Sequence, residues 1–230
     1  MKLLAIDTAT EACSAAVLRD GRLIERCQLA PREHNRLILP MIEAVLAEAG
    51  LKPGALDAIA FGRGPGSFTG VRIAAGVTQG IALGLGLPVI PVSTLAALAL
   101  DAMLDQGTDR AFACIDARMN EVYWGVYRLE AGGEPQLENP ETVCPAAAAP
   151  LTEGGPGTGI GSGWATYRET LAARVGLALR SILPDRFPRA AMIARLGAFR
   201  FARGETFPAD LAQPAYLRDQ VAIKPGRRDG

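Results

Sequence analysis

The sequence predicts a two-lobed α/β protein in which each lobe opens with three strands followed by a helix. Three observations support this fold class. Short apolar runs separated by turn residues precede the first helical segment. The same order of elements begins again after residue 110, and the first apolar run of each half ends in an aspartate, Asp7 and Asp116. We therefore divide the chain into lobes spanning residues 1–102 and 103–230.

The first half carries the clearer pattern. Asp20-Gly21 separates two apolar runs, as a hairpin turn does, and Gly50 follows the first helical segment as a C-terminal cap. Apolar residues at helical spacing define the helices, and short apolar runs define the strands. The predicted elements are strands over 3–6, 13–18 and 22–29, a helix over 33–49, a strand over 56–61, a helix over 69–85, a strand over 88–92 and a helix over 93–104.

The second half repeats this order less distinctly. Its last helix is a candidate for packing back on the first lobe. The predicted elements are strands over 111–116, 121–128 and 141–144, a glycine-rich loop over 154–163, and helices over 164–175 and 188–203.

Composition excludes several classes of protein. Basic and acidic side chains number 24 each, so the net charge is 0 and the whole molecule has no attraction for nucleic acid or an anionic membrane. Residues 174–203 depart from this balance, with seven arginines against Asp185 alone, and are interpreted as a solvated helix face or as a contact for a polyanion. Four cysteines without C-x-x-C spacing, a short N-terminal apolar run and no apolar stretch of ~20 residues predict a cytoplasmic protein with reduced thiols and no membrane span.

The sequence gives little support to a metal site or to a catalytic nucleophile. A single histidine, His34, excludes a site built on a pair of histidines, and no metal site is predicted. Residues 65–69 read Pro-Gly-Ser-Phe-Thr, so Ser67 does not meet the spacing of a nucleophile elbow. These features disfavour a peptidase, and we predict no catalytic residues in the chain.

The loop GRGPGSFTG, residues 62–70, has two interpretations that the residues alone leave open. A strand-to-helix turn rich in backbone N–H groups can bind an anion. The loop lacks the lysine of a Walker motif, however, and its glycines miss the G-x-G-x-x-G spacing. The alternative is a tight corner in which Ser67 or Thr69 caps the following helix.

The helix after this loop predicts a protein interface. Gly76, Gly80 and Gly84 recur every four residues and cost about 3 kcal/mol of helix propensity together, so close approach of another backbone must compensate. Packing on the protein's own sheet or neighbouring helix is the alternative explanation. The helix over 33–49 also has an apolar stripe wider than one sheet needs. The predicted interface residues are Leu37, Met41, Val45, Arg72, Gly76, Gly80 and Gly84.

Asp7 and Asp116 permit a second functional hypothesis. Aspartates at the ends of equivalent strands could face a cleft between the lobes and hold Mg²⁺ or orient a water for ATP chemistry. Turn or helix-cap acids are the plainer explanation. A self-sufficient ATP-dependent enzyme therefore stands as the alternative to a binding subunit.

Several short segments form a distinctive set along the chain: IDTAT at 6–10, HNRLILPMI at 34–42, GPGSFTGVRI at 64–73, VSTL at 92–95, DAR at 116–118, EVY at 121–123 and PAYLR at 214–218. Together they resemble the TsaB (YeaZ) family of bacterial tRNA threonylcarbamoyladenosine biosynthesis. The resemblance implies an actin/hexokinase/Hsp70-like (ASKHA, ribonuclease H-like) fold. Residues 130–189 match the family less distinctly.

The resemblance also implies a function. The family's partner is TsaD, which transfers the threonylcarbamoyl group to tRNA and carries a histidine pair for its metal, so this chain would be a non-catalytic scaffold. TsaE joins the assembly, tRNA is reached only indirectly, and the isolated chain would form a homodimer. The interface helices correspond to 33–49 and 69–85. No cofactor is expected to be bound tightly, but ATP or ADP at the subunit interface could contact Asp7, Gly64, Gly66, Ser67 and Thr69.

Overall fold

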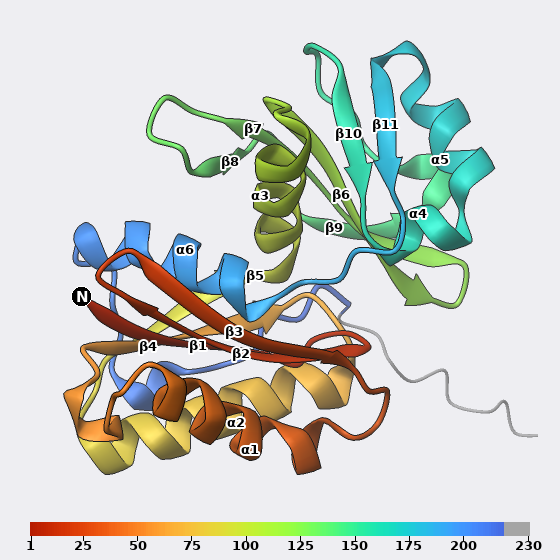
Figure 1. Cartoon of the computed structure of the whole chain (residues 1–230). Helices are drawn as coiled ribbons and strands as arrows, with labels where there is room; N and C mark the ends of the chain where they lie inside the picture. The colour runs from red at the N-terminus through yellow and green to blue at the C-terminus, as the bar shows by residue number, and fades with distance from the viewer. Residues whose placement is uncertain (219–230) are drawn as a thin grey trace, which may run out of the picture.

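The computed structural model describes residues 1–218, and it contains two mixed β-sheets, one in each lobe (Figure 1). Residues 219–230, which were assigned to the second lobe, lie outside the described residues. The first lobe contains β1 (Lys2–Asp7), β2 (Ala12–Arg19), β3 (Arg22–Leu29), α1 (His34–Glu48), β4 (Ala58–Gly64), α2 (Phe68–Leu85) and β5 (Val89–Ser93). The remaining elements are α3 (Thr94–Gln106), β6 (Arg110–Arg118), β7 (Glu121–Leu129), β8 (Pro135–Leu137), β9 (Thr142–Pro145), β10 (Gly157–Ile160), α4 (Ser162–Thr166), α5 (Arg168–Val175), β11 (Leu179–Leu183) and α6 (Ala190–Ala202).

The sheet of the first lobe has the order β3-β2-β1-β4-β5. Strands β1, β2 and β3 form an antiparallel meander, whereas β4 and β5 run parallel to β1. The hairpin between β2 and β3 turns at Asp20 and Gly21, whose φ values of 50° and 83° are those of a type I′ turn. The Asp-Gly pair therefore fixes this register, as the sequence predicted.

The second sheet repeats this topology. Its order is β11-β10-β6-β7-β8, and β9 also pairs with β7. Strands β10 and β6 run parallel, as β4 and β1 do, so the predicted two-lobed actin/hexokinase/Hsp70-like fold class is confirmed. The second lobe lacks the helix that follows the first three strands in the first lobe. A single 3-10 turn, Ala146–Ala148, takes that place, because Pro145 and Pro150 bracket a segment too short for a helix.

Two strands lie where the sequence predicted none, and one lies in the predicted loop. Strands β8 and β11 were not foreseen, and β10 runs through the glycine-rich segment 154–163. A Cβ added at Gly159 would come within 2.5 Å of the Trp164 ring, so the glycines leave room for a large core residue. The glycines that make β10 resemble a loop in the sequence are needed because the Trp164 ring packs against this strand.

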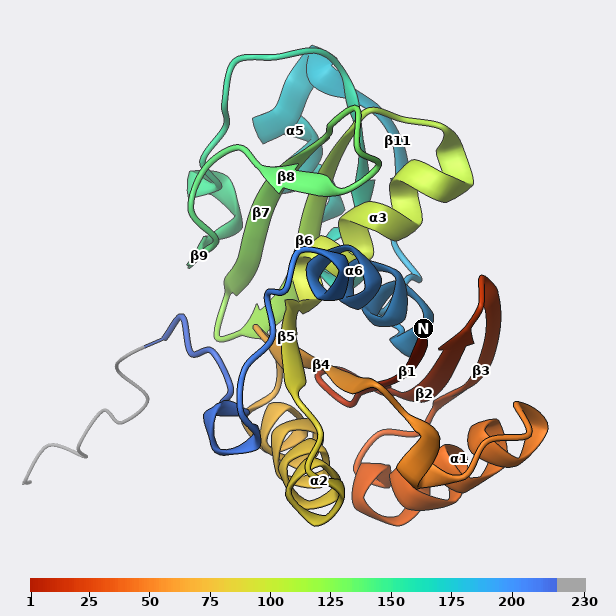
Figure 2. The same ribbon diagram turned by 90° about the vertical axis from the view of Figure 1, so that its left-hand side faces the viewer.

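Helices cover both faces of the first sheet. Helices α1 and α2 lie on one face and α6 on the other, as Figures 1 and 2 show. Helix α6 is anchored by the backbone N–H of Ala190, which donates to Ser14 Oγ at 2.9 Å, and Gly197 packs against Ala60. Helix α3 packs on the second sheet and on α6, so one core of buried side chains joins both lobes. The boundary predicted between residues 102 and 103 falls inside α3.

Most arginines of residues 174–203 bind the protein's own acids. Arg189 contacts Asp101 and Glu25, and Arg200 and Arg203 both contact Glu134. Arg189, Arg200 and Arg203 therefore tie α6 to the two lobes, whereas Arg180 and Arg195 are exposed, so the solvated-face interpretation holds for only part of the set and the polyanion contact stays a prediction. The further ion pairs in this set are Arg186 with Asp101 and Asp105, and Arg203 with Glu205.

Residues 204–218, which we call the C-terminal strap, run back along the first lobe. Phe207 pairs with Val89 through two backbone hydrogen bonds and so covers the free edge of β5. The strap then passes beside α2, as Figure 2 shows, and the N–H of Ala215 donates to the carbonyl oxygen of Arg63 at 2.8 Å. The part of the strap around Ala215 therefore lies over the glycine loop.

Helix α2 is long and apolar enough to cross a membrane by length and composition. Its inner side packs on the first sheet with Ala74, Ala75 and Ala82 buried, which is how a core helix of a globular lobe packs. The outer side is therefore the part that needs an explanation.

Candidate functional site

The glycine loop packs directly on the turn between β1 and β2. A Cβ on Gly66 would overlap the carbonyl oxygen of Ala9, and a Cβ on Gly70 would overlap that of Thr8. The N–H of Ser67 donates to the same Ala9 oxygen at 2.7 Å, and the Thr8 hydroxyl donates to the Gly70 carbonyl at 2.7 Å. These two glycines are required because two backbone segments touch, and this supports the tight-corner interpretation.

Ser67 also starts α2. Its Oγ accepts a hydrogen bond from the N–H of Gly70 at 3.1 Å, so it is the N-cap that the sequence predicted, whereas Thr69 lies within the first turn. The N–H of Val71 is bonded to the Ser67 carbonyl. Within residues 1–218, the N–H groups of Phe68 and Thr69 have no acceptor, and they lie at the positive end of the helix.

Asp7 does not reach the space between the lobes. Its side chain is fully buried, and a Cβ on Gly62 would overlap its Oδ2. Burial raises the pKa of Asp7 to about 7, although the N–H of Ala9, which donates to Oδ1 at 3.1 Å, partly opposes this shift. Oδ2 has no hydrogen-bond partner among the described residues. The prediction that Asp7 contacts a nucleotide or a metal from a cleft is therefore not supported by its position.

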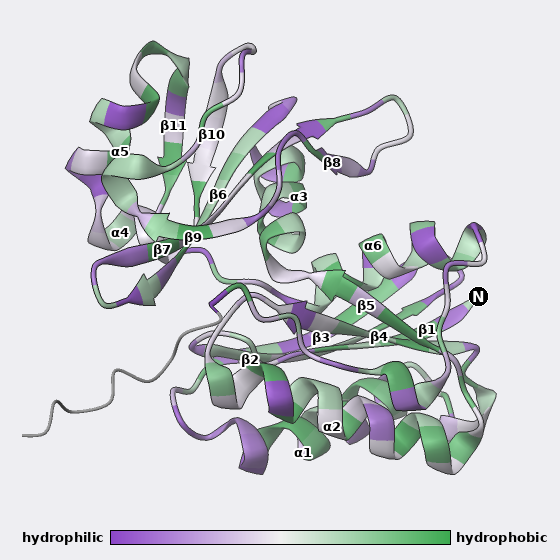
Figure 3. Cartoon of the chain, turned by 180° about the vertical axis from the view of Figure 1, so that it is seen from behind, coloured by the Kyte–Doolittle hydropathy of each residue, from purple (hydrophilic) through white to green (hydrophobic). Residues whose placement is uncertain are grey.

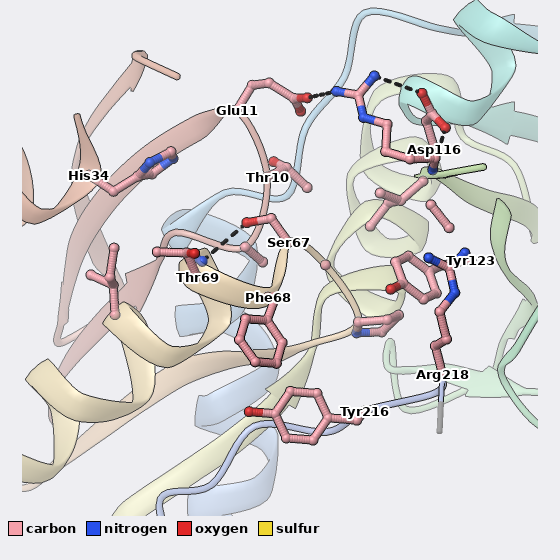
Figure 4. A pocket seen from close by; sticks show the side chains of 18 of the residues that line it. Thr10, Glu11, His34, Ser67, Phe68, Thr69, Asp116, Tyr123, Tyr216 and Arg218 are labelled. Atoms are coloured by element: carbon pink, nitrogen blue, oxygen red, sulfur yellow. Dashed lines mark hydrogen bonds and ion pairs between the residues drawn. The ribbon is translucent and has the colours of Figure 1, made fainter. Parts of the chain in front are cut away.

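A cleft of about 1050 Å³ separates the two lobes beside the start of α2 (Figure 4). Gly66, Ser67 and Thr69 line it, but Asp7 and Gly64 do not. The backbone of Gly64 has φ +104°, and a Cβ there would come within 3.0 Å of the Ala215 carbonyl, so the strap closes off this glycine. Three of the five predicted nucleotide contacts thus share one wall of the cleft.

The opposite wall comes from the second lobe. Asp116, at the end of the equivalent strand, accepts from Arg118 at 3.1 Å, and the same guanidinium reaches Glu11 of the first lobe at 2.9 Å. Figure 4 shows this bridge across the top of the cleft. Arg118 was not among the predicted site residues, although it belongs to the Asp-Ala-Arg segment that carried the family resemblance.

Aromatic side chains form a third part of the cleft. Arg72 stacks over Phe68 at 3.3 Å from the ring centroid, and Tyr216 of the strap lies 6.1 Å from Phe68 between ring centroids. Phe68 is 56% exposed and Tyr216 46%. The predicted interface residue Arg72 therefore stands at the junction of the cleft and the outer side of α2.

The outer side of α2 is open. Apart from the neighbouring residues and the nearby backbone of α2 itself, a Cβ added at Gly76, Gly80 or Gly84 would meet no atom of the described residues within 4 Å. The glycines therefore do not serve packing on the protein's own sheet or on α1. We call this surface the α2 face, and it consists of Arg72, Ile73, Gly76, Val77, Gly80, Leu83 and Gly84. Figure 3 colours most of α2 as hydrophobic.

Helix α1 contributes less to this surface than the sequence predicted. Leu37 and Met41 are half-buried, so part of each side chain remains accessible beside α2. Val45 is fully buried in the core of the first lobe and cannot contact another chain, which corrects its assignment to the interface. An apolar stripe on a helix does not reveal which of its edges the sheet covers.

No group of three or more His, Cys, Asp or Glu side chains that could hold a metal comes together in the described part of the chain. The fold class implies a Mg²⁺–nucleotide complex between the lobes in its enzymes. The residues here do not fit that complex, because Asp7 is sealed behind Gly62 and the glycines at 66 and 70 are occupied by backbone contacts.

Comparison with known proteins gives consistent results. Residues 27–222 match the family model for TsaD, tRNA N6-adenosine threonylcarbamoyltransferase. The chain is 42% identical to the tRNA threonylcarbamoyladenosine biosynthesis protein TsaB of Escherichia coli, over 99% of this chain and 100% of that protein. It is 40% identical to TsaB of Haemophilus influenzae, over 99% and 98%. The solved structure of YeaZ from Pseudomonas aeruginosa is 46% identical, covers 94% of this chain and 99% of its own, and superimposes with a TM-score of 0.88.

Proposed function

The chain belongs to the TsaB family of tRNA threonylcarbamoyladenosine biosynthesis proteins, and we propose that it is a non-catalytic subunit that pairs with the transferase TsaD. The α2 face would bind the partner, together with the accessible parts of Leu37 and Met41. The isolated chain would form a homodimer through the same surface until TsaD replaces the second copy. TsaE would join the assembled pair in the cytoplasm, and tRNA would be contacted through TsaD.

The open glycine strip carries this proposal. Gly76, Gly80 and Gly84 lower the helix propensity of α2 and gain no contact from the described residues in return. Small residues at four-residue spacing let the backbone of a second helix approach closely. Leu83, which is 62% exposed, and the half-buried Ile73 and Val77 supply apolar area on either side of the strip.

The absence of a transferase role in this chain is supported by its site. The one histidine cannot supply a metal-binding pair, and Asp7 has no access to the cleft. No tightly bound cofactor is part of the proposal, and ATP or ADP at the subunit interface stays a prediction. Among residues 1–218, no specific contact favours the alternative of a self-sufficient ATP-dependent enzyme.

Substitution of Gly80 tests the interface directly. Gly80→Leu places a large side chain on the strip, and it should abolish co-elution with TsaD in size-exclusion chromatography. The fold should not suffer, because leucine has a higher helix propensity than glycine and nothing lies within 4 Å of the new Cβ. Ala173→Leu is the matched control, since Ala173 is an exposed helical residue of α5 in the second lobe.

The control variant should co-elute with TsaD as the unmodified chain does. Circular dichroism should give both variants the same helical content and a cooperative thermal transition. Undiminished complex formation by Gly80→Leu would refute the assignment of the α2 face.

A further inference from the structure

We propose that the groove at the C-terminal end of α2 binds Arg72 of a second copy of this chain, which pairs there with Asp210. The groove and Arg72 lie at opposite ends of the α2 face. The inference rests on the proposed use of this face by a second copy. It adds the orientation of that copy and the contact that fixes it.

The groove is lined mainly by apolar side chains and carries one carboxylate. It has a volume of about 510 Å³ and lies between the last turn of α2 and the C-terminal strap. Leu83 is 62% exposed and Phe207 44%, so much of its apolar surface is open. The side-chain amide of Gln79 donates to the backbone carbonyl oxygen of Asp210 at 3.4 Å and holds the strap beside α2. The groove residues used below are Leu83, Leu87, Pro88, Phe207 and Asp210.

Two negative features of this groove favour a cation. Asp210 is exposed and has no ion pair within residues 1–218. Pro88 has no N–H, and the N–H of Leu87 donates to the carbonyl oxygen of Ala82. In the described part of the chain, the last carbonyl oxygens of α2 therefore have no backbone donor, and they form the negative end of the helix dipole. A side chain with an apolar stem and a cationic end, such as arginine, matches this combination.

Arg72 is a suitable cation at the other end of the α2 face. It is exposed and stacks over Phe68, with 3.3 Å between its Cζ and the ring centroid. Among residues 1–218 it forms neither an ion pair nor a hydrogen bond. Stacking uses the plane of the guanidinium and leaves the N–H groups at its edge available to a carboxylate. Arginine is also enriched among the residues that dominate the binding energy of protein interfaces.

The glycine strip sets the position of the second copy. Gly80 is the middle of the three glycines, so a two-fold axis beside it brings the two strips together in antiparallel orientation. Gly76 then faces Gly84 of the second copy. At about 1.5 Å per residue, Arg72 lies about 12 Å from Gly80 and faces the position about 12 Å beyond Gly80 in the second copy. That position is Pro88, which lines the groove.

Arg72 and the groove also lie on the same side of α2. Their directions around the helix axis nearly coincide, because Arg72 and Leu83 differ by only about 20° at 100° per residue. Antiparallel two-fold pairing keeps this side of both helices together. Parallel pairing would instead place Arg72 beside Arg72 and Asp210 beside Asp210, which like-charge repulsion disfavours. Charge complementarity therefore selects the antiparallel arrangement.

Charge reversal tests the contact because the two charges belong to different chains. Arg72→Glu and Asp210→Arg should each weaken homodimerisation of the full chain about tenfold, since each variant places like charges together twice in the dimer. In an equimolar mixture, the introduced glutamate meets the introduced arginine, and the remaining Arg72 meets the remaining Asp210. The mixture should therefore dimerise to within about threefold of the unmodified chain. Sedimentation equilibrium measures these dissociation constants.

Arg195→Glu and Asp109→Arg form the matched control pair. Both residues are exposed, Arg195 on α6 at the opposite face of the sheet and Asp109 between α3 and β6. The control variants should dimerise as the unmodified chain does, both alone and mixed. A mixture of Arg72→Glu and Asp210→Arg that dimerises no better than either variant alone would overturn the contact. Equal weakening by the control pair would overturn it as well.

Gly80→Leu separates this inference from the proposed function. It should abolish the homodimer as well as co-elution with TsaD. If it abolishes both while the mixture of charge variants stays monomeric, the α2 face is retained and the contact of Arg72 with Asp210 is wrong. If the unmodified chain is monomeric while Gly80→Leu still prevents co-elution with TsaD, the second copy is refuted and the pairing with TsaD is retained. If Gly80→Leu leaves both complexes intact, the inference and the proposed interface both fail.

Discussion

Gly66 lies in contact with the backbone of Ala9, and no Cβ can be added to Gly66 without overlapping the Ala9 carbonyl oxygen. Gly70 has the same relationship to Thr8. The glycines of the strand-to-helix loop and those of α2 therefore have opposite environments. One set is buried against the protein's own chain, and the other faces open space.

This contrast predicts opposite effects of alanine. Gly66→Ala should lower the free energy of unfolding by about 1–3 kcal/mol, because the methyl group overpacks the loop against Ala9. Gly76→Ala should raise it by up to about 1 kcal/mol, because alanine favours the helix and the methyl group meets no neighbour within 4 Å. Urea unfolding of both variants measures the difference. A neutral Gly66→Ala would contradict the close packing.

Asp7 should make stability fall as the pH rises. Burial raises its pKa from 3.8 to about 7, so the folded state holds a proton that the unfolded state releases above pH 3.8. The stabilising contribution is fully present below pH 3.8 and is lost as the pH passes about 7, and its size is at most about 4 kcal/mol. Asp7→Asn removes the titrating group.

The measurement compares urea unfolding of Asp7→Asn and the unmodified chain between pH 4 and 8.5. The variant should gain relative stability between pH 4 and about 7 and then keep a constant advantage up to pH 8.5, because Asp7 is ionised in both the folded and the unfolded state above its folded pKa. A difference between the two proteins that stays constant with pH would show that Asp7 does not titrate in this range.

Glu141 should hold the two lobes together. Its carboxylate accepts hydrogen bonds from the hydroxyl groups of Ser93 and Tyr127, and Arg63 approaches it at 3.9 Å. Burial, together with the Glu141 charge, raises the pKa of Tyr127, so its hydroxyl stays a donor. Glu141→Ala should lower the free energy of unfolding by about 2–4 kcal/mol, since buried hydroxyl groups lose their acceptor.

A double-mutant cycle isolates this contact. If the Tyr127–Glu141 bond contributes as described, Tyr127→Phe should cost less in the Glu141→Ala background than in the unmodified chain. Additive effects of the two substitutions would show that the Tyr127–Glu141 hydrogen bond does not contribute to stability.

The isolated chain should not turn over ATP. Asp7 is the residue that the fold class would use near the metal, and here it is fully buried behind Gly62. Phosphate release from ATP by the purified chain should equal that of a buffer blank, and Asp7→Ala should not change it. Turnover that Asp7→Ala abolishes would support the alternative of a self-sufficient enzyme.

The sequence predicted the first lobe better than the second for a physical reason. In the first lobe, regular apolar periodicity and good caps coincide with the elements, so local preference and packing agree. Strand β8 has three residues and β10 has two glycines among four, so neither carries a strand pattern. Their pairing is imposed by neighbours such as β6 and by the Trp164 ring.

Some features of the candidate site could likewise be predicted from the sequence, and others could not. The glycine strip could be read from the sequence because three glycines at helical spacing are unfavourable in any helix. The burial of Asp7 and Val45 could not, because it depends on which segments cover them. The role of the strap over Gly64 was also beyond prediction, since Arg63 and Ala215 lie far apart in the sequence and are joined only in the fold.

The position of α6 and Phe207 has a consequence for protein synthesis. Both follow β5 by about one hundred residues in the sequence, yet α6 covers one face of the first sheet and Phe207 its β5 edge. A nascent chain that has completed β5 must therefore wait, with an apolar sheet surface uncovered, until more than one hundred further residues have been translated. Helices α1 and α2 face the other way and emerge early, so a partner could engage them before the lobe beneath is finished.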